Sequence, residues 1–87
     1  MKESDKDMEA LEVNRIYRHW KGKFYYVHGL AVHTETGEMM VYYQTLYGDR
    51  SFYVRPVSQF TEKVPPDRVT ENMTGQLYRF EPYDFES

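Results

Sequence analysis

Apolar and polar side chains alternate along much of this chain with a period of two residues. In residues 14–20, Ile16 and Trp20 would lie on one face of an extended segment, and Tyr17 and His19 on the other. Alternation of this kind is typical of β-strands. The pattern predicts strands at residues 14–20, 24–33, 38–47 and 52–55, a helical turn at 57–60, and a short last strand at 76–80.

Residues 24–33 form the clearest of these strands, because apolar and aromatic side chains occupy both of its faces. Strict alternation places Tyr25 and Val27 on one face and Leu30 and Val32 on the other. We therefore expect this strand in the middle of a sheet or wrapped into a barrel. Gly29, near its middle, indicates a bend or a close approach of another backbone.

The spacing of the strands predicts the fold class. Short strands that recur about every 10–12 residues, with glycine-containing turns between them, indicate an all-β fold. We expect a small SH3-like barrel or a strongly twisted antiparallel sheet of four to five strands. An α+β fold, with the N-terminal segment packed as a helix, is the alternative.

One domain accommodates the whole sequence, in three stretches. Residues 1–12 are a polar segment, either a short helix or a frayed tail. Residues 13–62 form the β core, and residues 63–87 are a proline-containing acidic segment that holds the expected last strand.

The composition fits a small domain with an aromatic core. Nine Tyr, five Phe and one Trp supply the large side chains that a chain of 87 residues needs to bury enough surface. The absence of Cys excludes disulfides, thiolate metal sites and a Cys nucleophile, and fits a cytoplasmic protein. No apolar run approaches the roughly 20 residues of a membrane helix, and the polar start does not resemble a signal peptide. We therefore expect no membrane partner.

The net charge of −3 is unevenly distributed along the chain. Residues 13–58 carry six basic and three acidic side chains, whereas residues 1–12 and 59–87 each carry three more acidic than basic ones. A mildly basic core between acidic ends could attract anions, but the ends weaken nonspecific affinity for nucleic acids.

Several short motifs in the core resemble one known family. They are Tyr17-Arg18-His19, Lys21-Gly22, Tyr25-x-Val27, Ala31-x-His33-x-Glu35-Thr36-x-Glu38, Leu46-Tyr47-Gly48, Val54-Arg55-Pro56 and Phe60. In this order and spacing, residues 13–62 resemble the domain-of-unknown-function 1653 (DUF1653) family of short bacterial proteins. Tyr53 stands where Trp is expected, and Thr34 where Ser is usual. The resemblance implies a small bacterial, cytoplasmic domain and implies no activity.

Polar and aromatic residues near the predicted strand ends are the candidates for a site. They are Arg18, His19, His33, Glu35, Tyr47 and Arg55. Ends of neighbouring strands can converge at one mouth of a small barrel, where ligands bind. There the arginines would hold negative charge, the tyrosine would stack, and His33 and Glu35 would form hydrogen bonds. The alternative is structural: His33, Glu35 and Thr36 build the turn, and Arg55 pairs with a carboxylate across strands.

A non-catalytic binding module, with no cofactor and no metal, is the function that we expect. Its candidate ligands are an anionic small molecule such as a nucleotide, a nucleic acid, or a peptide. Tyrosines interleaved with basic residues favour single-stranded nucleic acids, while SH3-like domains bind peptides in aromatic grooves. The alternatives are a small enzyme using His33, Glu35 and Arg55, or a homodimer in which the second copy covers an apolar patch of Met39 and Met40 on an edge strand. We accordingly expect a monomer or a weak homodimer.

Overall fold

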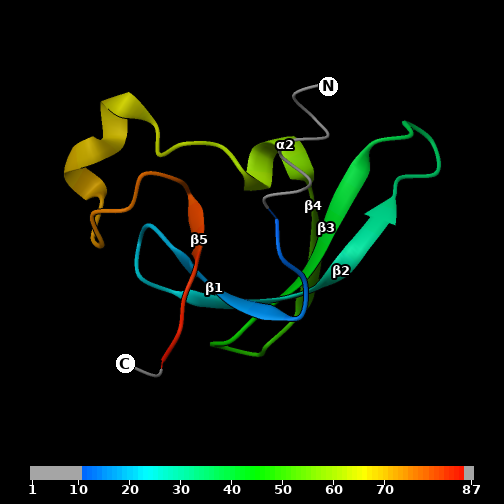
Figure 1. Cartoon of the computed structure of the whole chain (residues 1–87), viewed down its shortest axis with the longest axis horizontal. Coiled ribbons are helices and arrows are strands. Elements are labelled where there is room, and N and C mark those ends of the chain that lie inside the picture. Colours follow the sequence, from blue (N-terminus) through cyan, green and yellow to red (C-terminus); the bar gives the residue numbers. More distant parts are fainter. Residues whose placement is uncertain (1–10, 86–87) are drawn as a thin grey trace.

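A computed structural model describes residues 11–85, which fold into one antiparallel sheet of five strands (Figure 1). The strands are β1 (Arg15–His19), β2 (Phe24–Val32), β3 (Met39–Thr45), β4 (Phe52–Pro56) and β5 (Phe80–Pro82). One helical turn, α2 (Val57–Phe60), follows β4, and a 3-10 helix, η1 (Pro66–Glu71), precedes β5. The strand order in space is β4-β3-β2-β1-β5, so the chain returns past three consecutive strands to pair β5 with β1.

The all-β class is confirmed, in the form of the twisted sheet. β4 and β5 lie at opposite edges, so the sheet is not closed into a barrel. The first four predicted strands and the helical turn are present, with ends that differ by at most two residues. The segment expected at residues 1–12 lies outside the described residues, except for Leu11 and Glu12.

The last strand occupies a later position than the one predicted at residues 76–80. β5 begins at Phe80. The backbone N–H groups of Leu77 and Tyr78 both donate to the Glu81 carboxylate, at 3.0 Å each. Tyr78 itself forms an isolated antiparallel bridge with Lys63, and the Arg79 N–H donates to the Glu62 carbonyl at 2.8 Å. Residues 77–79 therefore pair with residues 62–64, and the pairing with β1 begins only at Phe80.

A β-bulge in β2 changes which side chains share a face. Val27 pairs with Tyr43, but the register then shifts between Val27 and Gly29, and Leu30 pairs with Val41. Because β3 alternates regularly, Leu30 lies on the same face as Val27. The prediction that strict alternation holds through residues 24–33 is therefore wrong, whereas the bend expected at Gly29 is present. An extra residue in one strand produces such a reversal.

The hydrophobic core lies between α2, β5 and one face of the sheet, which we call the inner face. Its buried residues are Leu11, Tyr17, Val27, Val41, Tyr43, Val57, Phe60 and Phe80. The rings of Phe60 and Phe80 stack with their centroids 4.1 Å apart, and the Tyr17 ring meets Phe60 edge-on at 5.4 Å. α2 therefore holds the return segment of the chain against the sheet.

Met39 and Met40 do not lie on an edge strand, as the homodimer hypothesis requires. Met39 and Met40 begin β3, which pairs with β2 on one side and β4 on the other. Met40 is buried. The prediction that these methionines form an exposed patch on an edge strand is therefore wrong, and they do not provide a surface for self-association in this way.

No helix within residues 11–85 has the length and the apolar character needed to cross a membrane.

Candidate functional site

One aromatic cluster on the inner face brings together three of the six predicted site residues. Tyr25 is at its centre. Its ring centroid lies 5.7 Å from that of Tyr43 and 5.3 Å from that of Phe80, and its hydroxyl lies 2.9 Å from the Tyr47 hydroxyl. We call this group the Tyr25 cluster and define it as His19, Tyr25, Tyr43, Tyr47, Arg55 and Phe80.

Strand pairing explains why these side chains meet. Phe80 on β5 is directly opposite His19 on β1, and their ring centroids are 4.9 Å apart. Towards the other edge of the sheet, Arg55 on β4 is opposite the buried Val41 on β3. The Arg55 side chain therefore points to the inner face, as that of Val41 does. β2 lies between these two pairs and supplies Tyr25, β3 supplies Tyr43, and Tyr47 follows the end of β3.

Two cationic side chains lie against rings of this surface. The Arg55 guanidinium carbon is 5.8 Å from the Phe80 centroid, and its Nε donates to the Tyr43 hydroxyl at 3.4 Å. The Lys23 Nζ is 4.9 Å from the Tyr47 centroid. Among the residues that the structure describes, neither Lys23 nor Arg55 forms an ion pair. Their positive charge is thus held by aromatic faces and not neutralised by a carboxylate.

His19 is a neutral member of the cluster at pH 7. Burial, and secondarily the positive charges of Arg55, Lys21 and Arg79, lower its pKa to about 4. The His19 Nδ1 accepts a hydrogen bond from the Lys21 backbone N–H at 3.1 Å, so its Nε2 carries the proton. The electrostatic environment of the imidazole is therefore cationic.

Tyr25 is also held in its neutral form. Burial, followed by the hydrogen bond with Tyr47, raises the pKa of the Tyr25 phenol above its ordinary value. The hydroxyl pair is therefore available as a neutral hydrogen-bonding group beside the cations.

Arg18 lies on the opposite, outer face of the sheet. Its Nε donates to the Gln76 side-chain oxygen at 3.0 Å, and its guanidinium carbon is 4.7 Å from the centroid of Tyr83. The Gln76 amide in turn donates to the Arg18 backbone carbonyl at 2.9 Å. These contacts attach the C-terminal segment to β1 and separate Arg18 from the Tyr25 cluster.

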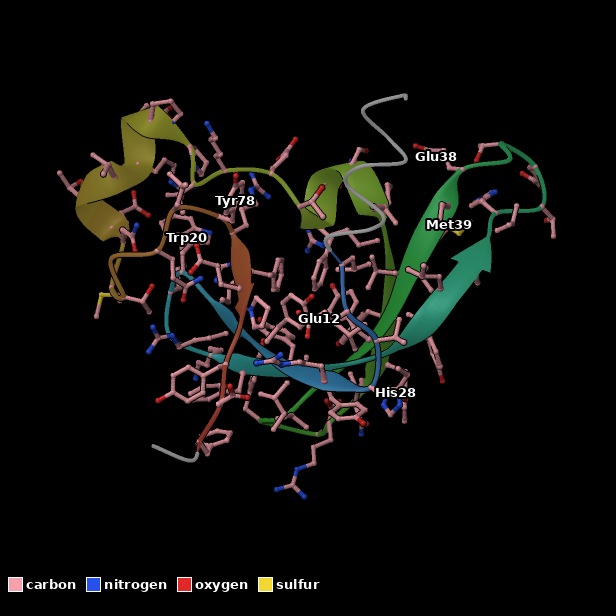
Figure 2. The ribbon with its side chains drawn as sticks, in the orientation of Figure 1. Glu12, Trp20, His28, Glu38, Met39 and Tyr78 are labelled. Atoms are coloured by element: carbon pink, nitrogen blue, oxygen red, sulfur yellow. The ribbon has the colours of Figure 1, made fainter. Side chains whose placement is uncertain are left out.

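His33 and Glu35 lie in the β2–β3 hairpin. The His33 Nδ1 accepts backbone N–H groups of Glu35 at 3.1 Å and Thr36 at 3.3 Å, which is the turn-building arrangement. This hairpin, marked by Glu38, and the β1–β2 turn, marked by Trp20, lie at opposite ends of the molecule (Figure 2). The contacts of the His33 ring lie within its own turn, whereas those of Arg55 are with Tyr43 and Phe80.

Sequence reasoning did not include Tyr25, Tyr43, Lys23 or Phe80 among the site residues. The first three belong to the set of interleaved aromatic and basic residues, but that set is too large to single them out. Phe80 lies 55 residues beyond Tyr25 in the sequence, and only the pairing of β5 with β1 brings it to the cluster.

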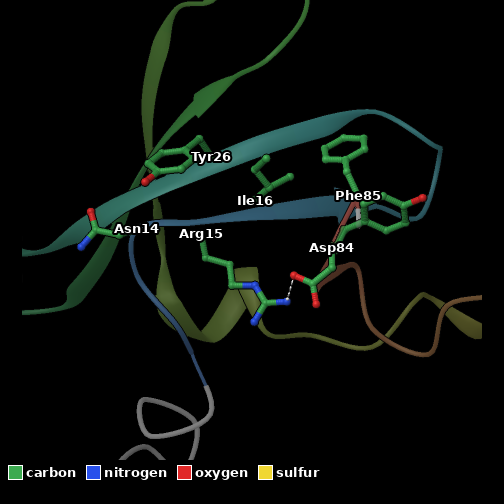
Figure 3. Close-up of a pocket in the computed structure, with 7 residues that line it drawn as sticks. Asn14, Arg15, Ile16, Tyr26, Asp84 and Phe85 are labelled. Atoms are coloured by element: carbon green, nitrogen blue, oxygen red, sulfur yellow. Dashed lines mark hydrogen bonds and ion pairs between the residues drawn. The ribbon is translucent and has the colours of Figure 1, made fainter. Parts of the chain in front are cut away.

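Two surface hollows are present elsewhere on the molecule. One, of about 590 Å³, lies where β1 and β2 meet the C-terminal segment, beside the Arg15–Asp84 ion pair (Figure 3). The other, of about 610 Å³, lies among β1, β5 and α2 over Tyr17 and Phe60. Neither is lined by His33, Glu35 or Arg55. Within residues 11–85, no three His, Asp or Glu side chains are grouped so as to hold a metal ion.

Comparison with known proteins places this geometry in a family. The model of a family described as "Protein of unknown function (DUF1653)" matches residues 15–82, which extends beyond the motifs at 13–62 to include β5. A crystal structure of a protein belonging to DUF1653 from Bordetella bronchiseptica is 31% identical, covers 88% of this chain and 91% of its own, and has a TM-score of 0.66. No curated protein matches the sequence.

Proposed function

The chain belongs to the DUF1653 family, whose function is unknown, and we propose that it is a non-catalytic binding module for an anionic ligand that carries an aromatic ring. A nucleotide unit, either free or within a single strand, has this chemistry. The observation that supports the proposal is the placement of Lys23 and Arg55 over the rings of Tyr47 and Phe80, with no ion pair to either cation in residues 11–85. We also propose a cytoplasmic location, because the family resemblance implies a small bacterial domain of that compartment.

The two parts of such a ligand have separate contacts in this proposal. A base stacks on the exposed faces of Tyr47 and Tyr53, which are 38% and 48% exposed. The phosphate lies between Arg55 and Lys23. Stacking of one base on an aromatic side chain contributes about 1–3 kcal/mol. The phosphate gains further, because binding it breaks no existing ion pair at these two cations.

His33 and Glu35 have no role in the proposed binding. Their hydrogen bonds complete the β2–β3 turn, and of the six residues predicted from the sequence only His19, Tyr47 and Arg55 remain in the site.

An amide-shift titration of the labelled protein tests the proposal. Mononucleotides and a short single-stranded oligonucleotide of mixed sequence are added in separate titrations, which distinguishes a free nucleotide from a strand. Saturable shifts should centre on residues 19, 23, 25, 47 and 55. Flat spectra with both ligands, or shifts centred on the hairpin at residues 33–36, would contradict the proposed site.

Two variants and one control test the role of the cations. Arg55→Ala and Lys23→Ala should each weaken binding at least tenfold while the spectrum stays that of a folded protein. Lys63→Ala is the matched control, because Lys63 is an exposed lysine at an isolated bridge to Tyr78. If Arg55→Ala unfolds the protein, Arg55 has a structural role and the Lys23→Ala result alone decides the question of binding.

A further inference from the structure

The strand β4 forms one edge of the sheet, and its outward side has no partner strand within residues 11–85. Its first three residues are exposed, on alternate faces of the sheet: Phe52 by 53%, Tyr53 by 48% and Val54 by 57%. An edge with apolar side chains and free backbone groups is a template for pairing with another strand.

The opposite edge is protected against such pairing. β5 has only three residues, and two of them are Glu81 and Pro82. A short strand, a charge and a proline are the common means by which proteins prevent edge pairing. In β4 the charge and the proline, Arg55 and Pro56, come only at the end of the strand. The Phe52–Val54 stretch has no such protection.

The hydrogen bonds of β3 show which backbone groups of β4 point outward. The Thr45 N–H donates to the Ser51 carbonyl at 3.1 Å, and along antiparallel strands such bonded pairs alternate with unbonded ones. The backbone groups of Tyr53 therefore face β3. Those of Phe52 and Val54 face away from the sheet, as does Pro56, which has no N–H to offer.

We propose that β4 pairs antiparallel with β4 of a second copy of this chain, about a two-fold axis at Tyr53. Phe52 of one copy is then opposite Val54 of the other. Every outward N–H and C=O of these two residues finds a partner, and Pro56 lies outside the bonded pairs. A register centred on Val54 would instead place Phe52 opposite Pro56, whose missing N–H leaves a carbonyl unpaired.

Self-complementarity favours a second copy over an unrelated strand. Phe52, Tyr53 and Val54 are uncharged, so nothing repels an identical strand. The register places Arg55 opposite Ser51 of the second copy, so no two like charges are directly opposed. The two-fold axis repeats the same favourable pairs on both sides of Tyr53.

Light scattering across a dilution series tests the pairing on the full chain. The wild type should have the mass of two chains at high concentration and of one chain after dilution. Val54→Lys places a charge on the paired edge and should shift the midpoint of dissociation at least tenfold to higher concentration. Val69→Lys is the matched control, because Val69 is 61% exposed on η1, away from the sheet, and this variant should dissociate like the wild type. Circular dichroism confirms that both variants are folded.

Hydrogen exchange of the wild type tests the register without any substitution. The amides of Phe52 and Val54 should be protected in concentrated solution and lose protection on dilution, while the Tyr53 amide stays protected throughout. A protein that is monomeric at all concentrations overturns the proposal, and so does a dimer that Val54→Lys leaves intact. Protection of Phe52 and Val54 that does not change on dilution also overturns it, because the edge is then covered within one chain.

Discussion

Acidification is expected to destabilise the protein through His19. The pKa of this imidazole is about 4 in the folded protein, against 6.5 for an ordinary histidine, mainly because the ring is buried and secondarily because Arg55, Lys21 and Arg79 lie nearby. As pH falls from about 6.5 towards 4, the unfolded chain takes up a proton at His19 that the folded chain does not. The free energy of unfolding therefore decreases as pH falls through this window, whereas above pH 6.5 the full contribution of the neutral His19 is present.

The magnitude follows from the size of the pKa difference. A difference of this size corresponds to at most about 3 kcal/mol, and screening of the partly exposed ring by solvent reduces it to about 2 kcal/mol. A domain of this size has a total stability on the order of 5 kcal/mol. Titration of one histidine would therefore remove a large share of it.

Urea unfolding at a series of pH values between 7 and 5 measures this effect. The wild type should lose stability steadily across the range. His19→Gln removes the titrating group, so its stability should be lower at pH 7, where ring contacts are lost, but should change less with pH. His28→Gln is the control, because it keeps His19 and should keep the pH dependence of the wild type.

Two results would refute this reasoning. One is a pH dependence in His19→Gln as steep as that of the wild type, which would assign the effect to other groups. The other is a directly measured pKa of His19 near 6.5, from the imidazole resonances, which would show that neither burial nor the neighbouring cations act on it as the structure implies.

Further predictions concern the core and the β2–β3 hairpin. Phe60→Ala should lower the free energy of unfolding by about 3–5 kcal/mol in urea, because the ring is fully buried against Phe80, while Ser58→Ala on the exposed side of α2 should change it little. His33→Ala should speed hydrogen exchange at the amides of residues 35 and 36, which donate to the imidazole, without a comparable loss of global stability. Unchanged exchange there would show that the turn is held by other contacts.

The sequence predicts the strands well because alternation is a local property, and it fails where a single residue changes the register. The bulge after Val27 places Leu30 on the face that alternation assigned to the other set. Gly29 indicates a bend, but a bend does not specify whether one residue is inserted into the strand. The faces of β2 beyond this point therefore could not be derived from the pattern.

The candidate site shows the same limit over longer distances. His19, Tyr47 and Arg55 could be selected by their chemistry, but their convergence depends on Tyr25 between them and on Phe80, which β5 carries across to β1. His33 could be selected by the same criteria, yet its ring is used within its own turn. Residue type indicates what a side chain could do, whereas strand order decides which side chains meet.

The two proposals are compatible on one surface. In the register centred on Tyr53, residues opposite each other lie on the same face of the continuous sheet, so the inner faces of both copies point to the same side. Each copy keeps its Tyr25 cluster, and the two Tyr53 rings meet between them, so pairing affects only the contact of a base with Tyr53. Loss of pairing in Val54→Lys should therefore leave the contacts of a mononucleotide with Lys23, Tyr47 and Arg55 in place, since the Val54 side chain lies on the outer face, opposite the cluster. Loss of binding in Lys23→Ala should leave the mass of the dimer unchanged, because Lys23 is not part of β4. Failure of one proposal can therefore be distinguished from failure of the other.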